Sequence, residues 1–212
     1  AAREAGVQRV LTVGSADVYG KVTPDELPLT EASPLRPTSP YAASKVAAES
    51  VAEQAFLGYG QQVVLARPFN HLGPGQSTRF VAPALAERIA RNEMTGESKL
   101  AVGNLSSKRD FTDVRDVVKA YRSMMLDGEP GEVYNVCSGE AIAVQDLAEA
   151  LIELSTIEQE LVTDPELMRT VDIPVLLGDS DRLRRATGWK PEVPLPQTLS
   201  DLLDDMRSRV AD

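Results

Sequence analysis

Residues 8–15, QRVLTVGS, form an apolar, β-branched run that stops at a glycine and a serine. Such a run, without polar alternation, predicts a buried strand of a parallel sheet. Ser39 and Pro40 then mark a helix start, because serine is a good cap and proline suits the first turn. The alanine-rich residues 41–57 predict the helix, and residues 62–66 predict a second buried strand. Strand, helix and strand in this order predict an α/β fold with a largely parallel sheet.

The same alternation continues along the chain. We expect a loop over residues 67–76, helices over 80–91, 114–126, 144–154, 179–187 and 195–210, strands over 100–102 and 133–136, and an extended segment over 172–177. No internal repeat or low-complexity linker interrupts this pattern.

The composition limits the classes of function. The 212 residues carry 32 acidic and 22 basic side chains and a net charge of −10. This balance disfavours a nucleic-acid partner, because phosphate binding needs clustered lysine and arginine. No apolar run approaches the roughly 20 residues that span a bilayer, so we expect no membrane partner. The single cysteine, Cys137, excludes an internal disulfide and a cysteine-rich zinc site. We expect a cytoplasmic protein without a metal.

Tyr41 and Lys45 are four residues apart in the predicted helix, so both side chains lie on one face. A lysine ammonium close to a phenol favours the phenolate, and a tyrosine tuned in this way can exchange a proton with an alcohol or carbonyl oxygen. Ser15, at the end of the first strand, can donate a hydrogen bond to the same oxygen. The spacing alone is a weak signal, since surface residues of a helix often share it.

Three segments strengthen that signal: residues 14–20 (GSADVYG), 37–40 (PTSP) and 67–70 (RPFN). From about residue 9 to residue 189, the chain resembles the extended short-chain dehydrogenases/reductases that modify nucleotide sugars. Within that family, the GDP-mannose branch is most similar, through residues 67–76 (RPFNHLGPGQ), 103–105 (GNL), 109–116 (RDFTDVRD) and 134–139 (YNVCSG). The first of these segments favours the GDP-6-deoxy-4-keto-mannose reductases over the GDP-mannose 4,6-dehydratases of the same branch.

The resemblance implies an architecture and a catalytic centre. Residues 1–68 match the C-terminal part of a Rossmann dinucleotide-binding domain, and residues 69–212 match mostly a smaller substrate-binding α/β domain interleaved with it. Ser15, Tyr41 and Lys45 match the catalytic triad of the family. Tyr41, Lys45 and Pro68 match residues that contact or border the nicotinamide end of NADP or NAD, whose hydride reduces the sugar. The resemblance also implies a homodimer, although the alanine-rich face of residues 42–55 could equally pack on its own sheet.

A GDP-linked sugar is the substrate that the resemblance implies, held by Asp17, Asn70, Arg109, Arg169 and Asp172. Arg109 matches an arginine that pairs with the diphosphate, and a guanidinium suits this task because its fork binds phosphate oxygens bidentately. A surface ion pair of Arg109 with Asp110 or Asp113 is the alternative. Asp172 is shorter than the glutamate usual at its position. We expect His71, Trp189 and Cys137 to be structural.

Three functions remain open. The reductase is favoured. A dehydratase would need an acid/base two residues before Tyr19, where Asp17 stands in place of the usual glutamate, and the reductases can carry an acidic residue there too. Another sugar-nucleotide epimerase or dehydratase is the third reading.

A glycine-rich Gly-x-x-Gly-x-x-Gly turn, which brings backbone and a helix N-terminus to the cofactor's pyrophosphate, does not occur in these residues. We therefore expect the N-terminal part of the family's domain to be missing and this chain alone to be inactive. A non-catalytic substrate-binding fragment is a further alternative.

Overall fold

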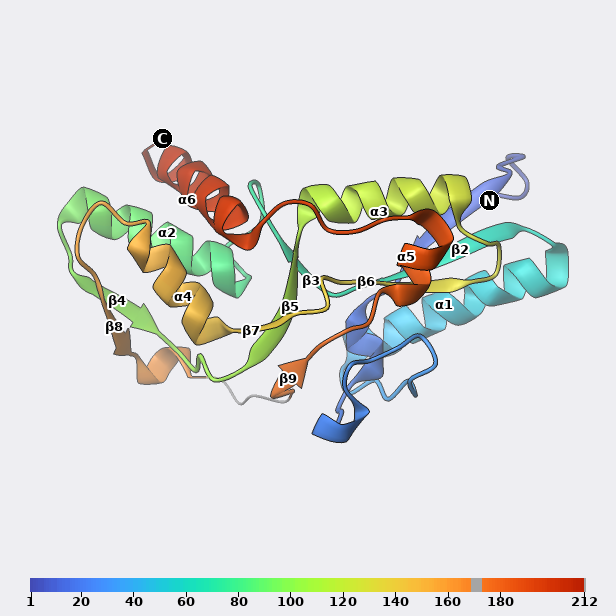
Figure 1. The fold of residues 1–212 in the computed structure, drawn as a ribbon, viewed down its shortest axis with the longest axis horizontal. Coiled ribbons are helices and arrows are strands. Elements are labelled where there is room, and N and C mark those ends of the chain that lie inside the picture. The colour runs from blue at the N-terminus through green and yellow to red at the C-terminus, as the bar shows by residue number, and fades with distance from the viewer. Residues whose placement is uncertain (169–172, 212) are drawn as a thin grey trace.

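The computed structural model describes residues 1–168 and 173–211. Its first half is built on a parallel sheet in the order β1 (Arg9–Val13), β2 (Gln62–Pro68) and β6 (Val133–Val136). Helix α1 (Pro40–Tyr59) links β1 to β2 and lies on one face, and α3 (Val114–Asp127) lies on the other (Figure 1). The prediction of an α/β fold with parallel strands is confirmed.

Helix α1 begins and ends where its sequence dictates. Ser39 Oγ accepts a hydrogen bond from the Ala42 N–H at 3.1 Å, and Pro40 opens the first turn. Gly60 ends the helix in the left-handed conformation, with φ at 65°. These are the cap residues that helix termini prefer at each end. The helix therefore presents Tyr41 in its first turn at a fixed place above the end of β1.

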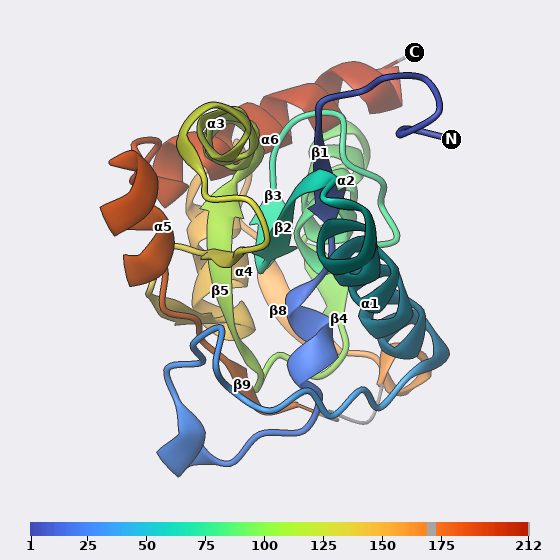
Figure 2. The same ribbon diagram turned by 90° about the vertical axis from the view of Figure 1, so that its right-hand side faces the viewer.

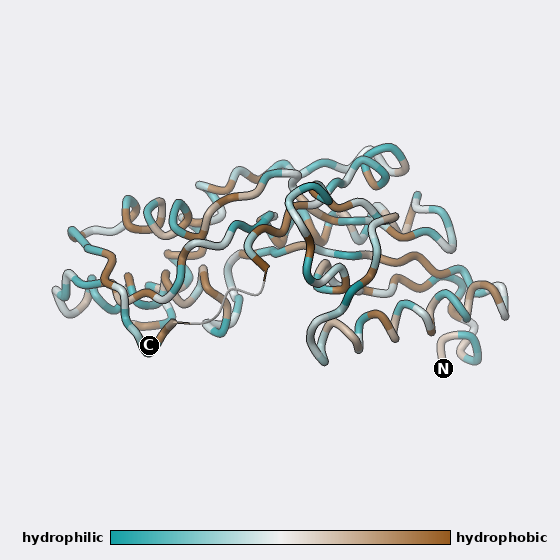
Figure 3. Tube along the Cα trace, turned by 90° about the horizontal axis from the view of Figure 1, so that it is seen from below, coloured by the Kyte–Doolittle hydropathy of each residue, from teal (hydrophilic) through white to brown (hydrophobic). Residues whose placement is uncertain are grey.

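The second half packs three helices around a core of aliphatic side chains. Helices α2 (Val81–Thr95), α4 (Val144–Glu153) and α6 (Leu195–Ala211) cover the parallel pair β4 (Lys99–Val102) and β8 (Glu160–Thr163). Hydrophobic and hydrophilic stretches alternate along the helices in Figure 3, as expected of helices with one buried face. Among the described residues, no helix has both the length and the apolar character needed to cross a bilayer.

Strand β5 (Lys108–Asp113) connects the two halves, as Figures 1 and 2 show. It pairs with β3 (Asn70–Leu72) and β9 (Val175–Leu176) in parallel and with β7 (Ala141–Ala143) antiparallel. Strand β5 runs directly into α3. Its last residue, Asp113, therefore caps α3 in the first half of the molecule, whereas β5 begins beside the second half. The short helix α5 (Asp181–Thr187) then packs on α3 and β6.

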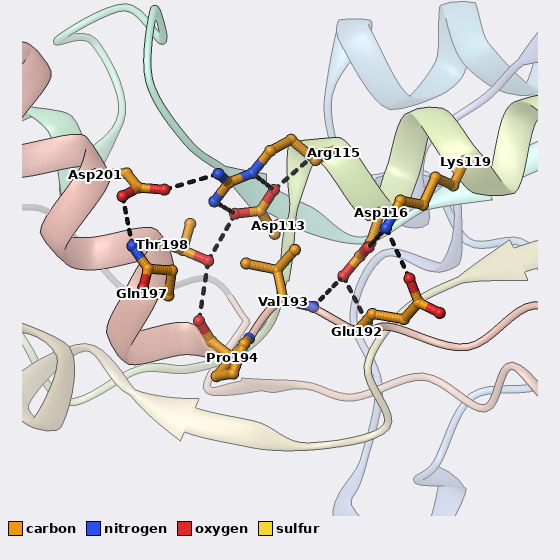
Figure 4. Close-up of polar contacts among 10 residues, drawn as sticks. All are labelled: Asp113, Arg115, Asp116, Lys119, Glu192, Val193, Pro194, Gln197, Thr198 and Asp201. Atoms are coloured by element: carbon orange, nitrogen blue, oxygen red, sulfur yellow. Dashed lines mark hydrogen bonds and ion pairs between the residues drawn. The ribbon is translucent and has the colours of Figure 1, made fainter.

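Two polar clusters fasten this junction (Figure 4). Asp113 caps α3, accepts hydrogen bonds from Arg115 and accepts another from Thr198 Oγ1 of α6 at 2.7 Å. Asp116, fully buried, accepts from the backbone N–H groups of Glu192 and Val193, each at 2.7 Å. The segment between α5 and α6 is thereby tied to α3.

Most sequence-based elements are confirmed within a few residues, but four details are wrong. Residues 67–76 are not a loop throughout, because they contain the end of β2 and all of β3. Strands β5, β7 and β8 were not predicted. Strands β7 and β8 are only three or four residues long, and such short segments are extended because of the partner they pair with rather than their own composition. Strand β5 is longer, but its residues RDFTD are mostly polar or charged and do not show the apolar run of a buried strand.

Candidate active site

The candidate catalytic residues gather where β1 ends. Ser15 follows β1 by two residues and caps a short 3₁₀ helix, Ala16–Tyr19, with its Oγ accepting from the Asp17 N–H at 3.2 Å. The cap fixes the backbone of Ser15 relative to Asp17. Pro68 is the last residue of β2, next to this end of the sheet. The carboxyl ends of neighbouring parallel strands are where α/β sheets bind ligands.

Tyr41 and Lys45 reach the same end of the sheet from α1. Tyr41 is 53% exposed, so its phenol is open to a ligand. Lys45 Nζ lies 5.7 Å from the centroid of the Tyr41 ring and donates to the Val13 carbonyl at 3.0 Å. The four-residue spacing therefore puts the ammonium beside the ring and against the end of β1. The hydrogen bonds between described residues do not join Ser15 directly to Tyr41.

A cavity of about 600 Å³ lies beside these residues, and Asp17, Asn70 and Arg109 all line it. They come from the 3₁₀ helix after β1, the start of β3 and the start of β5, three separate parts of the chain. Three of the predicted substrate-binding residues thus share one cavity. Ser15, Tyr41, Lys45 and Pro68 are not among the lining residues, but Ser15 is two residues from Asp17 and Tyr41 is two residues from Ser39, which both line the cavity.

Burial and charge act in opposite directions on the two ionisable groups of this cavity. Burial raises the pKa of the Asp17 carboxyl above its usual value, although the positive charge of Arg109 works to lower it. Burial lowers the pKa of the Arg109 guanidinium, and the Asp17 carboxylate opposes that change. Each charge therefore favours the other across the cavity.

The alternative of a surface ion pair for Arg109 is wrong. Asp110 is buried and accepts hydrogen bonds from Ser138 and from the Gly139 N–H. Asp113 is occupied by Arg115 and Thr198. Arg109 donates to the Lys108 carbonyl at 2.8 Å and lines the cavity, and among the described residues it forms no ion pair with Asp110 or Asp113.

Several lining residues were not foreseen from the sequence. They are mainly polar or small residues from the segment before α1, from α2 and the turn before it, and from the segment after β4: Thr38, Ser39, Arg79, Phe80, Arg88, Gly103, Asn104 and Ser107. Val81, Ala84, Leu85 and Arg88 also line the cavity and are spaced as one helix face. That period was available in the sequence and could have placed Arg88 at the site.

The remaining predicted residues divide into two groups. Arg169 and Asp172 lie outside the described residues. The structural roles expected for the other three agree with their environment. Cys137 and Trp189 are buried, and Trp189 Nε1 donates to the Asp116 carbonyl at 2.9 Å. The Nδ1 atom of His71 lies 3.1 Å from the Phe69 carbonyl oxygen.

Comparison with known proteins identifies the family of this chain. The family model described as GDP-mannose 4,6 dehydratase matches residues 1–202. The chain is 43% identical to the GDP-6-deoxy-D-mannose reductase of Pseudomonas aeruginosa over 201 residues, which are 94% of this chain and 66% of the relative. It is 34% identical to the dTDP-D-glucose 4,6-dehydratase of Mus musculus over 92% of this chain and 54% of the relative.

The solved structure of RMD from Pseudomonas aeruginosa complexed with NADPH has the same fold, with a TM-score of 0.93 and 42% identity. The match covers 98% of this chain and 69% of that one. The chain thus spans between about half and two thirds of the length of these relatives. The Rossmann-like architecture expected from the sequence is confirmed by this likeness.

Proposed function

Because this chain belongs to the GDP-mannose 4,6-dehydratase family of nucleotide-sugar enzymes, we propose that it carries the sugar-nucleotide site and proton-transfer residues of an NAD(P)H-dependent reductase. The substrate is GDP-4-keto-6-deoxy-mannose, and the reaction reduces its 4-keto group. The observation that carries the proposal is the cavity in which Asp17, Asn70 and Arg109 meet beside Ser15. The identity to a named GDP-6-deoxy-D-mannose reductase supports the choice of reaction.

Each residue has a distinct task in this reaction. Tyr41 donates a proton to the sugar C4 oxygen, and the Lys45 ammonium beside its ring stabilises the phenolate that remains. Ser15 donates a hydrogen bond to the same oxygen. Arg109 and Asn70 hold the diphosphate at the other end of the cavity, which fixes the distance between C4 and Tyr41.

The residues at the end of the sheet fit the nicotinamide half of a dinucleotide cofactor. An exposed phenol, an ammonium held by the Val13 carbonyl and the Pro68 ring line the carboxyl ends of β1 and β2. We propose Tyr41, Lys45 and Pro68 as the cofactor contacts of this chain. When bound, NADPH or NADH supplies the hydride. The likeness to a structure complexed with NADPH supports the phosphorylated form.

Calorimetry with two sugar nucleotides tests the binding half of the proposal. GDP-mannose should bind the chain, and UDP-glucose should bind at least tenfold more weakly. Arg109→Ala should weaken GDP-mannose binding about 10- to 100-fold, because a hydrogen bond to a charged group contributes about 1.5–3 kcal/mol. Arg91→Ala is the matched control, since Arg91 is exposed, pairs with Glu87 and does not line the cavity. Equal binding of both sugar nucleotides would refute the GDP assignment.

A dehydratase is the second candidate, and Asp17 is the observation that favours it. Its carboxyl lines the cavity and has a raised pKa, which suits a group that must both take and give a proton. Turnover by the full-length protein separates the candidates. A reductase consumes NADPH with the 4-keto sugar, a dehydratase removes one water from GDP-mannose, and a non-catalytic binding protein does neither while still binding. The two-domain division and a homodimer remain predictions.

A further inference from the structure

Helix α1 carries a third polar side chain on the face of Tyr41 and Lys45. Glu49 follows Lys45 by four residues, so the three side chains lie one above another along the helix. Tyr41 is exposed, Lys45 is bound to the end of β1, and Glu49 is buried with only 6% of the residue exposed. A buried carboxylate is costly unless it is paired.

The partner of Glu49 is Arg67 of β2. Arg67 Nε lies 3.1 Å from each Glu49 carboxylate oxygen, and Nη2 donates to Oε2 at 2.8 Å. Both side chains are 7% exposed. A two-pronged pair of this kind fixes direction as well as distance. Glu49 therefore attaches α1 to β2, at the residue just before Pro68.

Arg67 is itself held from the other side. Its Nη1 donates to the Tyr19 hydroxyl and to the Glu31 carbonyl, each at 3.2 Å. The Tyr19 hydroxyl donates in turn to Asn135 Oδ1 at 2.6 Å. Tyr19 ends the 3₁₀ helix that Ser15 caps. The guanidinium thus connects α1, β2, β6 and the segment that carries Ser15 and Asp17.

The Glu49 carboxylate also touches the backbone next to Ser15. A Cβ atom on Gly14 would lie 2.5 Å from Glu49 Oε1 and 3.0 Å from the Ala66 carbonyl oxygen. Glycine at position 14 allows this approach. The Glu49 carboxylate, two helical turns from Tyr41, therefore lies close to the residue before Ser15.

We propose that the Glu49–Arg67 pair positions the catalytic turn of α1, holding Tyr41 and Lys45 at the distance from Ser15 that proton transfer to one oxygen requires. Glu49 and Arg67 are positioning residues, since they do not line the cavity. The inference rests on the proposed function for its kinetic consequence. A buried ion pair is weak support for stability, because apolar residues of similar volume often replace it without loss.

Three variants test this role. Glu49→Gln removes the charge and keeps the shape. The double variant Glu49→Leu with Arg67→Met removes both charges and keeps the volume apolar, so it should unfold at a urea concentration close to that of the unaltered protein. Glu93→Gln is the matched control, because Glu93 also pairs bidentately with an arginine, Arg207, but joins α2 to α6.

Turnover, measured in the full-length protein because this chain alone is expected to be inactive, is the first readout. Glu49→Gln and the double variant should both lower kcat about 10- to 100-fold, because a 1 Å misplacement of reacting groups costs on the order of 100-fold. KM for the sugar nucleotide should change less than about twofold, since Arg109 and Asn70 are untouched. Glu93→Gln should leave kcat unchanged. Recovery of kcat together with stability in the double variant would refute a positioning role.

Amide hydrogen exchange is the second readout and does not depend on the reaction. Residues 43–49 and residues 14–15 should exchange at least about tenfold faster in the double variant than in the unaltered chain, while the rest of the sheet stays protected. Unchanged exchange at these residues would overturn the proposal. If the full-length, unaltered protein fails to reduce any 4-keto sugar nucleotide, the proposed function alone is refuted, and exchange still decides the positioning role.

Discussion

Two arginine–glutamate ion pairs hold helices in the two halves of the molecule. Arg67 and Glu49 join β2 to α1, and Arg207 and Glu93 join α6 to α2. In both, the guanidinium reaches both carboxylate oxygens, at 2.7–3.1 Å. The environments differ: Arg67 is 7% exposed, whereas Arg207 is 31% exposed and donates to the Leu154 carbonyl as well.

This difference in exposure decides what each pair contributes. Water reaches Arg207 and can solvate it when Glu93 is removed, so the second pair stabilises the contact of two helices and can be replaced. Arg67 is almost shielded from water, so removing Glu49 alone would leave a buried charge without a partner and destabilise the fold, whereas removing both charges together would not. The buried Glu49–Arg67 pair, here called the sealed pair, joins the helix that carries Tyr41 and Lys45 to β2. The more exposed Glu93–Arg207 pair, here called the open pair, does not line the cavity. We therefore expect the Glu49–Arg67 pair to restrict the position of α1, and the Glu93–Arg207 pair to add only to the packing of α2 on α6.

Breaking the sealed pair should have the largest effect on stability. Glu49→Ala leaves the Arg67 charge buried without its carboxylate, and we expect a loss of about 3–5 kcal/mol in the free energy of unfolding. Glu93→Ala, its counterpart in the open pair, should cost no more than about 1–2 kcal/mol. Urea unfolding of both variants measures the difference. Equal losses would show that exposure does not separate the two pairs.

Asp116 shows whether a buried carboxylate needs an arginine partner at all. Asp116 is fully buried and accepts from two backbone N–H groups and from Lys119 Nζ at 3.1 Å (Figure 4). Asp116→Ala strands both N–H groups, and we expect a loss of about 2–3 kcal/mol in the free energy of unfolding.

Lys119→Ala is the control for that variant. Lys119 is 51% exposed, so its removal should cost less than about 0.5 kcal/mol. Urea unfolding again gives both values. A larger loss from Lys119→Ala than from Asp116→Ala would mean that the charge pair, rather than the backbone contacts, fastens the segment between α5 and α6.

The sequence predicted the part of the site that depends on local spacing. Tyr41 and Lys45 are neighbours because they are four residues apart in a helix whose start is marked by Ser39 and Pro40. The strand ending at Val13 predicted where Ser15 would lie. The resemblance to a family added Asn70 and Arg109, and both line the cavity.

The parts that escaped prediction depend on contacts between distant segments. Glu49 and Arg67 are 18 residues apart on a helix and a strand, and nothing in either segment alone shows that they meet. A glutamate in a helix is usually solvated, so its burial could not be expected. Only the four-residue spacing from Lys45 to Glu49 gave a signal, since it puts the carboxylate on the face that meets the sheet.

The pH dependence of stability should report the open pair. Hydrogen bonds from Arg207 lower the pKa of Glu93 from 4.5 to about 2. Because the folded pKa lies below the unfolded one, the stabilisation is complete above about pH 4.5 and is lost as the pH falls toward 2. The full shift would be about 3 kcal/mol; because water screens Arg207, we expect about 1–2 kcal/mol.

Urea unfolding between pH 2 and 6 measures how the free energy of unfolding falls with pH, which is the acid limb of the stability profile. Glu93→Gln should flatten it, and Arg207→Ala should do the same, because the lowering comes mainly from the arginine. A limb that keeps its slope in both variants would assign the acid sensitivity to other carboxylates.

The smallest effect is expected at the Arg91–Glu87 pair, whose arginine is exposed, and this pair sets the lower end of the comparison. Arg91 and Glu87 are one helical turn apart on α2, their nitrogen and oxygen lie 2.9 Å apart, and the Arg91 side chain is 63% exposed. Arg91→Ala should change the free energy of unfolding by less than about 0.5 kcal/mol, since an exposed pair four residues apart contributes about 0.3–0.5 kcal/mol. Raising the salt concentration to about 1 M should remove even that difference, because the screening length then falls to about 3 Å. A loss above about 1 kcal/mol at high salt would mean that the aliphatic part of Arg91, rather than its charge, packs against α2.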